Sequence, residues 1–412
     1  MGTDHYRSFR KSKSTTTSSA LTILFTLCCA IGCKSVIDRQ DVRPRVLRDV
    51  PARNLAYRLS ADVSPPSANL DDTSDKLPVI ANDFAAKRED AALLRTVVSP
   101  DGRRVLALYG SADEPSSVFR IDLYSSDGQF LRNLIPPDLA CVCPETVAWS
   151  PDGNLINFIA RRRVVPSPTP TPPNQPGPED IPLSTASPSP VAPFFAPVAT
   201  FNTEQIYVCN RDGFDLKPLT SRDGLIYFYF LWAPDGHAMA ALACKEDEWN
   251  ARERQYKLPA GRPRLIAPDG TERLLDDGMT EALPVWSPDA SKVATAFDTD
   301  VAIYDGAGKT PTQARLPLGD QLITASVSYE QKTATKKVPA NANAKPTPSP
   351  TPAASSAPAV PASFNPIVRL DWRAPETLYI QTAFVRLMPT ETINTFQRWH
   401  VLNLSAQAAV LK

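Results

Sequence analysis

One short turn recurs along this chain and constrains its fold more than any other feature. It reads V-S-P-D-G at 98–102, W-S-P-D-G at 149–153, W-A-P-D-G at 232–236, W-S-P-D-A at 286–290 and W-R-A-P-E at 372–376. Proline presets the backbone of a turn, aspartate bonds its own backbone, and glycine takes the positive-φ position without steric cost. Apolar and β-branched residues flank the turns, so each predicts a β-hairpin. The residues expected to build these corners are Trp149, Pro151, Asp152, Gly153, Trp232, Pro234, Asp235, Gly236, Trp286, Pro288 and Asp289.

The spacing of these turns indicates a repeat of roughly 50 residues. Two of the gaps between turns have this length, and two are longer. Each long gap contains one tract rich in Pro, Thr, Ser and Ala, at 165–200 or at 332–366, and removing the tract restores the period. A period of this length fits a four-stranded blade of a β-propeller.

A second marker divides each repeat. Asp-Gly pairs, which are a strong hairpin signal between apolar runs, follow the recurring turn at 126–128, 211–213, 268–270 and 304–306. Two hairpins per repeat make four strands, so the recurring turn joins the first strand of a blade to the second. In the second repeat we expect the first strand to end at Trp149 and the other three to cover 155–160, 205–209 and 214–219.

The W-S-P-D-G turn, followed by an apolar strand and then by I-Y-x-x-x-x-D-G with a leucine closing the next strand, resembles the TolB-like (PD40, WD40-like) β-propeller repeat. The resemblance covers 93–412. It implies an all-β fold, a β-propeller of four-stranded blades. The composition of 165–200 and 332–366 predicts that these two Pro-rich tracts are disordered insertions. Such propellers serve as envelope scaffolds, partner-binding platforms and substrate gates of peptidases, so the fold does not name the function.

The number of blades depends on the ends of the repeat region. Five repeats are recognisable, and six blades are favoured over five. Residues 52–92 supply either a degenerate blade or closing strands, with candidate strands at Asn54–Ser60 and Lys76–Ala81. The last repeat is expected to end with strands at Phe396–Leu404 and Ala406–Leu411.

Alternation along the first strand of each blade separates two sets of side chains. One set fits blade-to-blade packing and consists of the tryptophan position and the residue two before it: Val98 and Thr96, Trp149 and Val147, Trp232 and Phe230, Trp286 and Pro284, and Trp372 and Leu370. The opposite set forms a candidate polar collar at the central channel: Arg95, Thr146, Tyr229, Arg369 and Asp371. The alternative for this set is structural, with buried hydrogen bonds and an Arg369–Asp371 ion pair.

The N-terminus reads as an export signal. A basic region, Arg7–Lys13, precedes an apolar run, Ala20–Cys33, which is shorter than the roughly 20 residues that cross a bilayer. The run ends in A-I-G-C, which resembles the lipobox of bacterial lipoproteins. This resemblance implies a signal peptide at 1–32, lipid on Cys33 and a tether at 33–51. An ordinary cleaved signal and an uncleaved anchor are the alternatives.

Lys34 follows the candidate lipidated cysteine. It stands where lipoproteins retained at the inner membrane carry aspartate, so the resemblance favours the periplasmic side of the outer membrane. Several acyl chains on Cys33 would give durable membrane attachment.

Export also bears on four further cysteines, Cys141, Cys143, Cys209 and Cys244, because an oxidising compartment permits disulfides. The alternation of strand direction puts Cys141, Cys143 and Cys244 at one face of the disk. We therefore expect a disulfide from Cys141 or Cys143 to Cys244, with buried free thiols as the alternative. The same count predicts that both Pro-rich tracts leave that face, as spacers, as polyproline ligands, as O-glycosylation sites or as tolerated insertions.

Residues that could carry chemistry are few. The sequence has no G-x-S-x-G, and its three histidines, His5, His237 and His400, do not suggest a metal cluster. G-A-G-K-T at 306–310 lacks the earlier glycine of a phosphate loop, because Ile303 stands there. We therefore expect no catalytic residue, no metal and no cofactor.

The charges balance at 44 basic and 44 acidic residues, which gives no electrostatic case for binding nucleic acid. The sequence thus predicts a monomeric, lipid-anchored β-propeller that binds or scaffolds envelope proteins without catalysis. The alternatives are a small-ligand sensor or enzyme that uses the channel mouth, and a degenerate relative of a peptidase-associated propeller.

Overall fold

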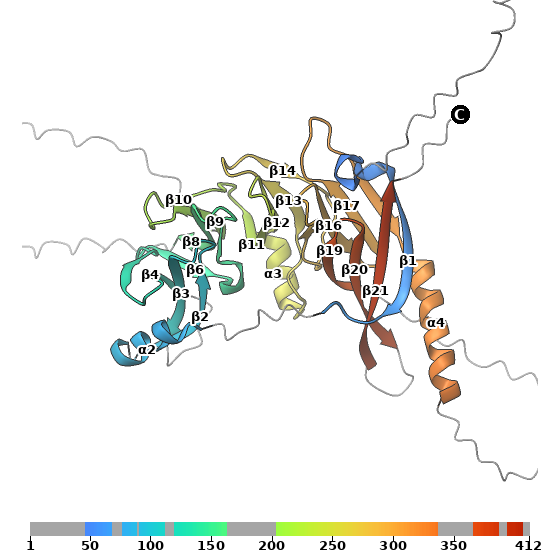
Figure 1. The fold of residues 1–412 in the computed structure, drawn as a ribbon, viewed down its shortest axis with the longest axis horizontal. Helices are drawn as coiled ribbons and strands as arrows, with labels where there is room; N and C mark the ends of the chain where they lie inside the picture. Colours follow the sequence, from blue (N-terminus) through green and yellow to red (C-terminus); the bar gives the residue numbers. More distant parts are fainter. Residues whose placement is uncertain are drawn as a thin grey trace, which may run out of the picture. The chain divides into compact units, whose positions relative to one another are not determined.

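The computed structural model describes residues 46–67, 76–88, 90–111, 119–162, 203–336, 366–386 and 394–406. Signal, lipidation and first-tract predictions at 1–32, Cys33 and 165–200 lie outside these residues, as do most of the tether and of the second tract. The segment Val46–Lys412 is one compact unit. Its described residues form five antiparallel sheets, which we call blades 1 to 5 in chain order (Figure 1). The predicted all-β fold of antiparallel sheets is confirmed, and four of the five sheets of the described residues have the predicted four strands; blade 2 has five because β6 and β7 both pair with β8.

The strands follow one another along the chain within each blade, with one exception in blade 5. Blade 1 contains β2 (Ala91–Val98), β3 (Arg104–Ser111), β4 (Arg120–Ser125) and β5 (Phe130–Asn133). Blade 2 contains β6 (Leu139–Val142), β7 (Ala148–Trp149), β8 (Leu155–Arg162), β9 (Gln205–Asn210) and β10 (Lys217–Pro218). Blade 3 contains β11 (Leu225–Trp232), β12 (Met239–Lys245), β13 (Arg262–Ile266) and β14 (Glu272–Leu274). Blade 4 contains β15 (Val285–Trp286), β16 (Lys292–Phe297), β17 (Asp300–Asp305) and β18 (Gln313–Pro317). Blade 5 contains β19 (Ile367–Ala374), β20 (Thr377–Arg386), β21 (Asn394–Ala406) and β1 (Leu55–Val63).

The recurring turn lies between the first two strands of each blade, as the sequence predicts. In blade 2 the Ser150 hydroxyl accepts a 2.9 Å hydrogen bond from the Leu155 amide and donates to the Asp152 carboxylate. Blades 1 and 4 repeat both contacts with their own Ser and Asp. The hydroxyl thus links the two strands, which explains why serine recurs before Pro-Asp.

The tryptophan that ends the first strand closes the seam with the preceding blade. The Trp149 indole donates to the Val97 carbonyl at 3.1 Å, and the Trp286 indole donates to the Leu231 carbonyl at 3.0 Å. Val98 stands at the equivalent position of blade 1 and is 48% exposed. The large side chain therefore recurs where the chain has an earlier blade to pack against.

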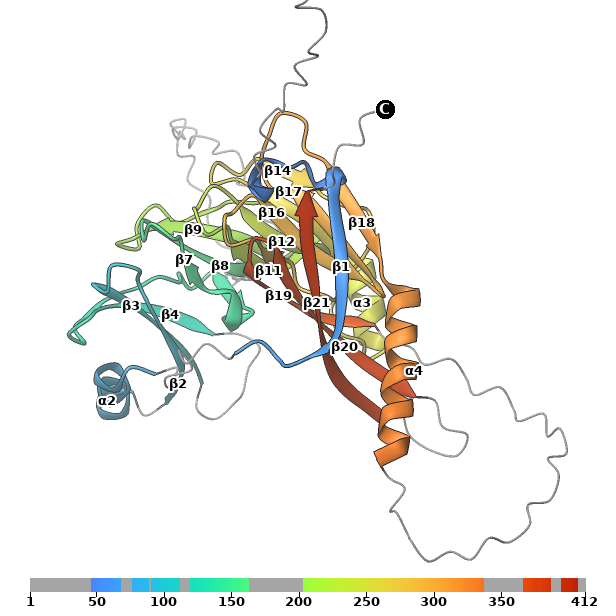
Figure 2. The same cartoon turned by 45° about the vertical axis from the view of Figure 1, so that its right-hand side comes forward.

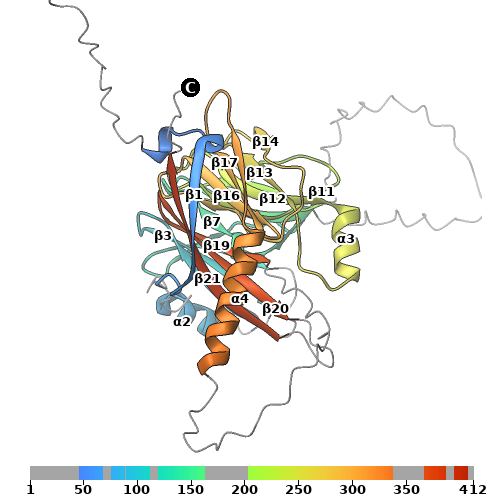
Figure 3. The ribbon, with the colours of Figure 1, turned by 90° about the vertical axis from the view of Figure 1, so that its right-hand side faces the viewer.

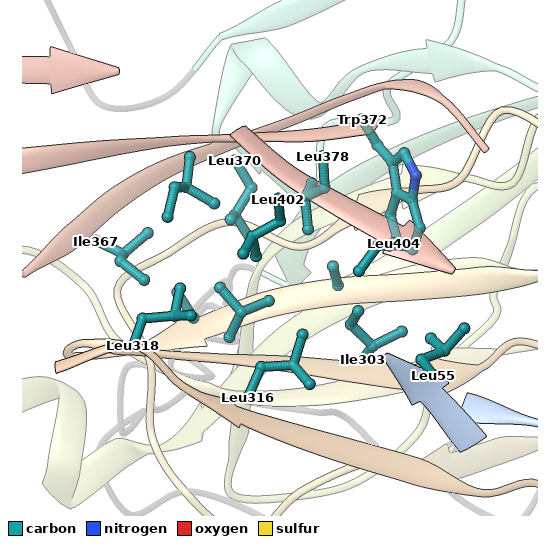
Figure 4. Close-up of a cluster of buried hydrophobic side chains, with 14 of the residues drawn as sticks. Leu55, Ile303, Leu316, Leu318, Ile367, Leu370, Trp372, Leu378, Leu402 and Leu404 are labelled. Atoms are coloured by element: carbon teal, nitrogen blue, oxygen red, sulfur yellow. The ribbon is translucent and has the colours of Figure 1, made fainter. Parts of the chain in front are cut away.

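Each seam is filled by its own cluster of buried apolar side chains. Representative members are Leu106, Ile121, Trp149 and Phe158 for blades 1 and 2; Ile159, Ile206, Tyr227 and Met239 for blades 2 and 3; Ala240, Leu265, Trp286 and Val293 for blades 3 and 4; and Ile303, Leu316, Leu370 and Leu402 for blades 4 and 5. Figure 4 shows the last of these clusters, in which Leu55 also takes part. The blades therefore stack in series.

Blade 5 is completed by the N-terminal part of the described chain. β1 pairs antiparallel with β21, from Leu55 opposite Ala406 to Val63 opposite Trp399 (Figure 2). The expected fourth strand at Ala406–Leu411 needs correction: β21 continues to Ala406 as one strand, and β1 occupies its free edge. Residues 407–411 lie outside the described chain.

The expected strand at Lys76–Ala81 is wrong, because helix α2 (Pro78–Lys87) occupies most of it. Pro78 suits the first turn of a helix, and Ile80 and Phe84, four residues apart, are both buried. They pack on the face of blade 1 that carries Val105 and Tyr124. With β1 in blade 5 and α2 on blade 1, the described residues of 52–92 form no separate sheet, and the six-blade count stays a prediction.

Two further helices lie in connections between strands (Figure 3). Helix α3 (Glu246–Arg254) joins β12 to β13, and helix α4 (Gly319–Lys336) follows β18. The tract expected from residue 332 therefore begins inside α4. The buried residues Leu322, Ala325 and Ser326 form a stripe along this helix, which packs against blade 5. In the part of the chain that the structure describes, no helix is both long and apolar enough to span a membrane. That both tracts leave one face stays a prediction.

Three short 3₁₀ turns complete the elements: η1 (Leu47–Asp49), η2 (Ala52–Asn54) and η3 (Pro144–Thr146). The last of these matters for the site. It separates β6 from β7, so the first strand of blade 2 is divided in two, whereas the first strand of blade 3 is one element from Leu225 to Trp232 with a register shift between Tyr227 and Tyr229.

Candidate binding pocket between blades 2 and 3

A cavity of about 570 Å³ opens at the seam between blades 2 and 3. Blade 2 contributes the segment after β6, part of β8 and the residues before β9, while β11 and helix α3 form the other walls. The lining residues are Val142, Cys143, Pro144, Glu145, Arg161, Thr203, Glu204, Ile226, Tyr227, Phe228, Glu246, Trp249, Asn250 and Glu253. We call this cavity the seam pocket.

Helix α3 presents one of its faces to the seam pocket. Glu246, Trp249, Asn250 and Glu253 line the cavity, and their spacing of three, four and seven residues places them on one side of a helix. The sequence favours a helix here because acidic residues occupy its first turn and Arg252 and Arg254 its last turn, which suits the helix dipole. The Lys245 amide also donates to the Glu248 carboxylate at 2.9 Å, which caps the N-terminus.

The other face of α3 is fixed to blade 3 by ion pairs. Arg262 of β13 donates two hydrogen bonds to the Glu248 carboxylate, at 2.7 and 2.8 Å. These bonds lower the pKa of Glu248 to about 2. Arg252 donates to the Leu258 carbonyl at 2.7 Å and pairs with Glu281. The pocket wall formed by α3 is therefore held in place by contacts outside the pocket.

Part of the lining of the seam pocket is aromatic. The Trp249 ring packs on the Phe228 ring with centroids 5.6 Å apart. Phe228 is buried and belongs to a cluster with Cys244, against which the half-buried Cys143 also packs. Trp249 is half-buried, so part of its ring faces the cavity.

The charges around the pocket are unbalanced. Its lining has four carboxylates, Glu145, Glu204, Glu246 and Glu253, and one guanidinium, Arg161. Arg161 pairs with Glu204 at 3.5 Å. Among the described residues no salt bridge forms to the other three carboxylates, so the pocket carries an uncompensated negative charge.

The predicted polar collar is not assembled by the contacts of the described residues. Arg95 donates to the Val147 carbonyl at 2.9 Å, and the buried Thr146 hydroxyl donates to the Cys143 carbonyl at 2.7 Å. Both side chains therefore brace the segment 143–147, which forms one wall of the seam pocket. Tyr229 packs in the cluster of Phe228 and Cys244, where burial raises the pKa of its hydroxyl to about 12.

The Arg369–Asp371 ion pair, part of the structural alternative to the collar, is wrong as well. Asp371 has an arginine two residues away on either side, and its carboxylate binds Arg373 at 2.7 Å. The Arg369 guanidinium instead lies 6.0 Å from the Trp399 ring centroid. Arg369 and Asp371 both belong to β19 of blade 5, whereas the other collar residues belong to other blades.

The predicted disulfide is absent, since Cys141, Cys143, Cys209 and Cys244 are all free thiols. Cys141 packs in the seam of blades 1 and 2, whereas Cys143 leaves β6 with a left-handed backbone, φ 58°, and packs beside the seam pocket. The two side chains thus serve different seams. Burial raises the pKa of Cys143, Cys209 and Cys244 to about 12 and that of Cys141 further still.

Sequence reasoning missed α3 and with it the seam pocket. The signal that could have found it is the stretch EDEWNARER, which places one tryptophan among charged residues at helical spacing where a tight hairpin is expected. Among the residues with described side chains, no group of three or more His, Cys, Asp and Glu could hold a metal ion.

Comparisons with known proteins concern the fold. No family model matches this chain, and no curated protein matches it. Among solved structures, it is similar to prolyl oligopeptidase B from Galerina marginata at 10% identity, with a TM-score of 0.39, over 86% of this chain and 41% of that chain. It is similar to the Dos1 propeller at 11% identity, with a TM-score of 0.37, over 85% and 63% of the two chains. It is also similar to the Swd1 β-propeller domain of Myceliophteria thermophila at 8% identity, with a TM-score of 0.34, over 75% and 72%. The chain spans less than two thirds of the length of the first two.

Proposed function

We propose that this protein is an exported, lipid-anchored binding module that holds a protein partner at the bacterial cell envelope without catalysing a reaction. The observation that carries the proposal is the seam pocket, a cavity whose walls are fixed before any ligand arrives. Glu248 and Arg262 hold α3 from behind, while Arg95 and Thr146 brace the opposite wall. Preformed walls reduce the entropy lost on binding, which favours recognition.

The envelope part of the proposal rests on the A-I-G-C end of the signal and on Cys33. We expect full-length protein expressed in a bacterium to incorporate an alkyne-labelled fatty acid and to sediment with membranes. Cys33→Ser should lose both properties while the blades stay folded by circular dichroism. Label or sedimentation that persists in this variant would contradict lipid anchoring.

The partner can be tested by site-specific photo-crosslinking in intact cells. A crosslinking amino acid at Asn250, exposed in the seam pocket, should give a discrete adduct with one envelope protein. The matched control is Lys309, an exposed residue in a turn of blade 4. The same adducts from both positions, or none from position 250, would contradict a protein-binding role for the pocket.

A small-ligand sensor is the second candidate, and the size of the pocket favours it. Its volume of about 570 Å³ lies within the range of roughly 300–1,000 Å³ that is common for small-molecule sites. Native mass spectrometry of the purified protein tests this candidate. A bound compound that disappears in Trp249→Ala would support the sensor.

A further inference from the structure

We infer that the seam pocket binds the guanidinium or ammonium group of an arginine or lysine side chain in a basic segment of the partner protein. This inference rests on the proposed function and names the chemistry that the partner must present. It is carried by three features of the pocket together: its cavity, its aromatic wall and its excess of carboxylates.

The carboxylates are placed to attract a cation that enters the cavity. Glu246 and Glu253 lie on the pocket face of α3, two turns or about 10 Å apart along the helix axis, with Trp249 between them. Glu145 lies on the opposite wall, in blade 2. A cation between these walls would lie near carboxylates on both sides, and its attraction to each falls only as the inverse of distance.

The aromatic wall selects among cations. Trp249 keeps part of its ring open to the cavity while Phe228 supports the ring from one side. Tryptophan is the best aromatic partner for an ammonium or guanidinium group, which binds over the ring face. A cation over an aromatic ring occurs elsewhere in the chain, since the Arg132 guanidinium carbon lies 3.4 Å from the ring centroid of Phe214.

Other ligand classes fit less well. An anion would meet three carboxylates that lack an ion pair within the described chain. A bare metal ion needs closely grouped ligands, and the described side chains offer no such group of His, Cys, Asp and Glu. A delocalised organic cation tolerates carboxylates on separate walls. Arg161, which contacts Glu204 in the lining, shows that this wall accepts a guanidinium.

A chain segment suits the site better than a free small cation. Glu145, Glu246 and Glu253 are exposed at the rim, where each ion pair is weak and screened by salt. A segment with several basic residues can engage the rim and the Trp249 ring at once. The whole chain has balanced charges, so the acidity that would attract such a segment is local.

The test uses the full chain carrying Cys33→Ser and a fluorescein-labelled tetra-arginine peptide, with tetra-glutamate as the control peptide. We expect fluorescence anisotropy to show binding of tetra-arginine only. The double variant E246Q/E253Q should bind it about tenfold more weakly, and Trp249→Leu about threefold more weakly. The matched control D223N/D247N removes the same charge from exposed carboxylates outside the lining and should stay within about twofold.

Three outcomes would overturn the inference. Equal weakening in E246Q/E253Q and in D223N/D247N would show attraction to the overall charge rather than to the pocket. Spermidine that binds as tightly as tetra-arginine would replace the partner segment with a diffusible cation. No binding of tetra-arginine would refute the cation class. If tetra-arginine does not bind, a crosslinked adduct at position 250 would still support the proposed binding module. The absence of that adduct would contradict both the cation inference and the proposed function.

Discussion

The seam between blades 3 and 4 and the seam between blades 2 and 3 are built from the same repeat, yet they differ at both ends. At the 3–4 seam the Trp286 indole bonds the Leu231 carbonyl, and the Arg273 guanidinium bonds the Asp305 carbonyl at 2.7 Å. At the 2–3 seam the Trp232 indole nitrogen is buried without a hydrogen-bond acceptor among the described residues. The other end of β11 borders the seam pocket.

The difference shows where a repeat protein can place a site. Two departures from the repeat make room at the 2–3 seam: η3 breaks the first strand of blade 2, and α3 replaces a tight hairpin in blade 3. The 1–2 and 3–4 seams keep the indole bond to the preceding blade, whereas at the 4–5 seam the Trp372 indole donates to the Pro375 carbonyl of its own turn. Departures from local consistency tend to coincide with functional sites, and here they surround the one cavity for which we propose a ligand.

The largest expected effect concerns Trp286 at the seam between blades 3 and 4. Trp286→Ala should lower the free energy of unfolding by about 4 kcal/mol, because it empties a large buried volume. In the milder pair, Trp286→Phe should cost about 1 kcal/mol more than Trp232→Phe, since only Trp286 loses a hydrogen bond. Urea denaturation measures both differences. Equal costs in the two phenylalanine variants would erase the distinction between the seams.

The turns at these seams offer a matched pair of substitutions. Ala290 has a left-handed backbone, φ 59°, where Gly236 of blade 3 has φ 74°. We expect Ala290→Gly to stabilise the protein and Gly236→Ala to destabilise it, each by about 1 kcal/mol, because a Cβ atom is disfavoured in this conformation. A Cβ at position 236 would lie 3.6 Å from Pro151, an ordinary contact, so the cost would be conformational. Thermal unfolding should shift in opposite directions.

Lowering the pH should destabilise the α3 wall of the seam pocket before it affects the seam between blades 3 and 4. The Glu248 carboxylate, whose pKa falls from 4.5 to about 2 beside Arg262, stabilises α3 fully above pH 4.5. That contribution is lost as the pH falls from 4.5 to about 2. Hydrogen exchange should therefore show α3 losing protection in this window while β16 keeps its own. Glu248→Gln should remove the pH dependence, and unchanged protection of α3 at pH 3 would contradict its anchoring role.

The last prediction concerns the relative reactivity of two thiols, Cys143 beside the seam pocket and Cys244. A pKa raised from 9.0 to about 12 leaves Cys143 with about a thousandfold fewer thiolates than in the unfolded chain at pH 8. We expect iodoacetamide to modify Cys143 slowly, yet before Cys244, because Cys143 lines the seam pocket and Cys244 is buried. Peptide mapping by mass spectrometry follows both. A Cys143–Cys244 disulfide in the native protein would reverse this expectation.

The sequence predicted the blades because their determinants are local. Each Ser-Pro-Asp turn carries its own hydrogen bonds, and the spacing of the tryptophans reflects the packing of neighbouring blades. The strand predicted at Asn54–Ser60 is present as β1, but its pairing with β21 joins residues at opposite ends of the described chain, so no local pattern reveals its partner. The strand expected at Lys76–Ala81 was wrong because burial of Ile80 and Phe84 against blade 1, a tertiary contact, favours a helix.

The site was harder to predict than the fold. The polar collar was inferred from strand alternation alone, but Arg95 and Thr146 turn to backbone carbonyls and Asp371 turns to Arg373. Strand alternation does not show which partner a polar side chain binds, because that choice depends on the tertiary contacts of the folded chain. The seam pocket depends on α3, a nine-residue helix with one large apolar side chain, too short for hydrophobic periodicity to identify.

The pairing of β1 with β21 also governs the order in which the molecule can be assembled. Leu55 is synthesised long before Ala406, its partner in the ladder. Until β21 emerges, β1 has no edge to join, and an unpaired strand is prone to adhere to other chains. The first strand of the fold is therefore among the last to be secured, and chaperones would be needed most during that interval.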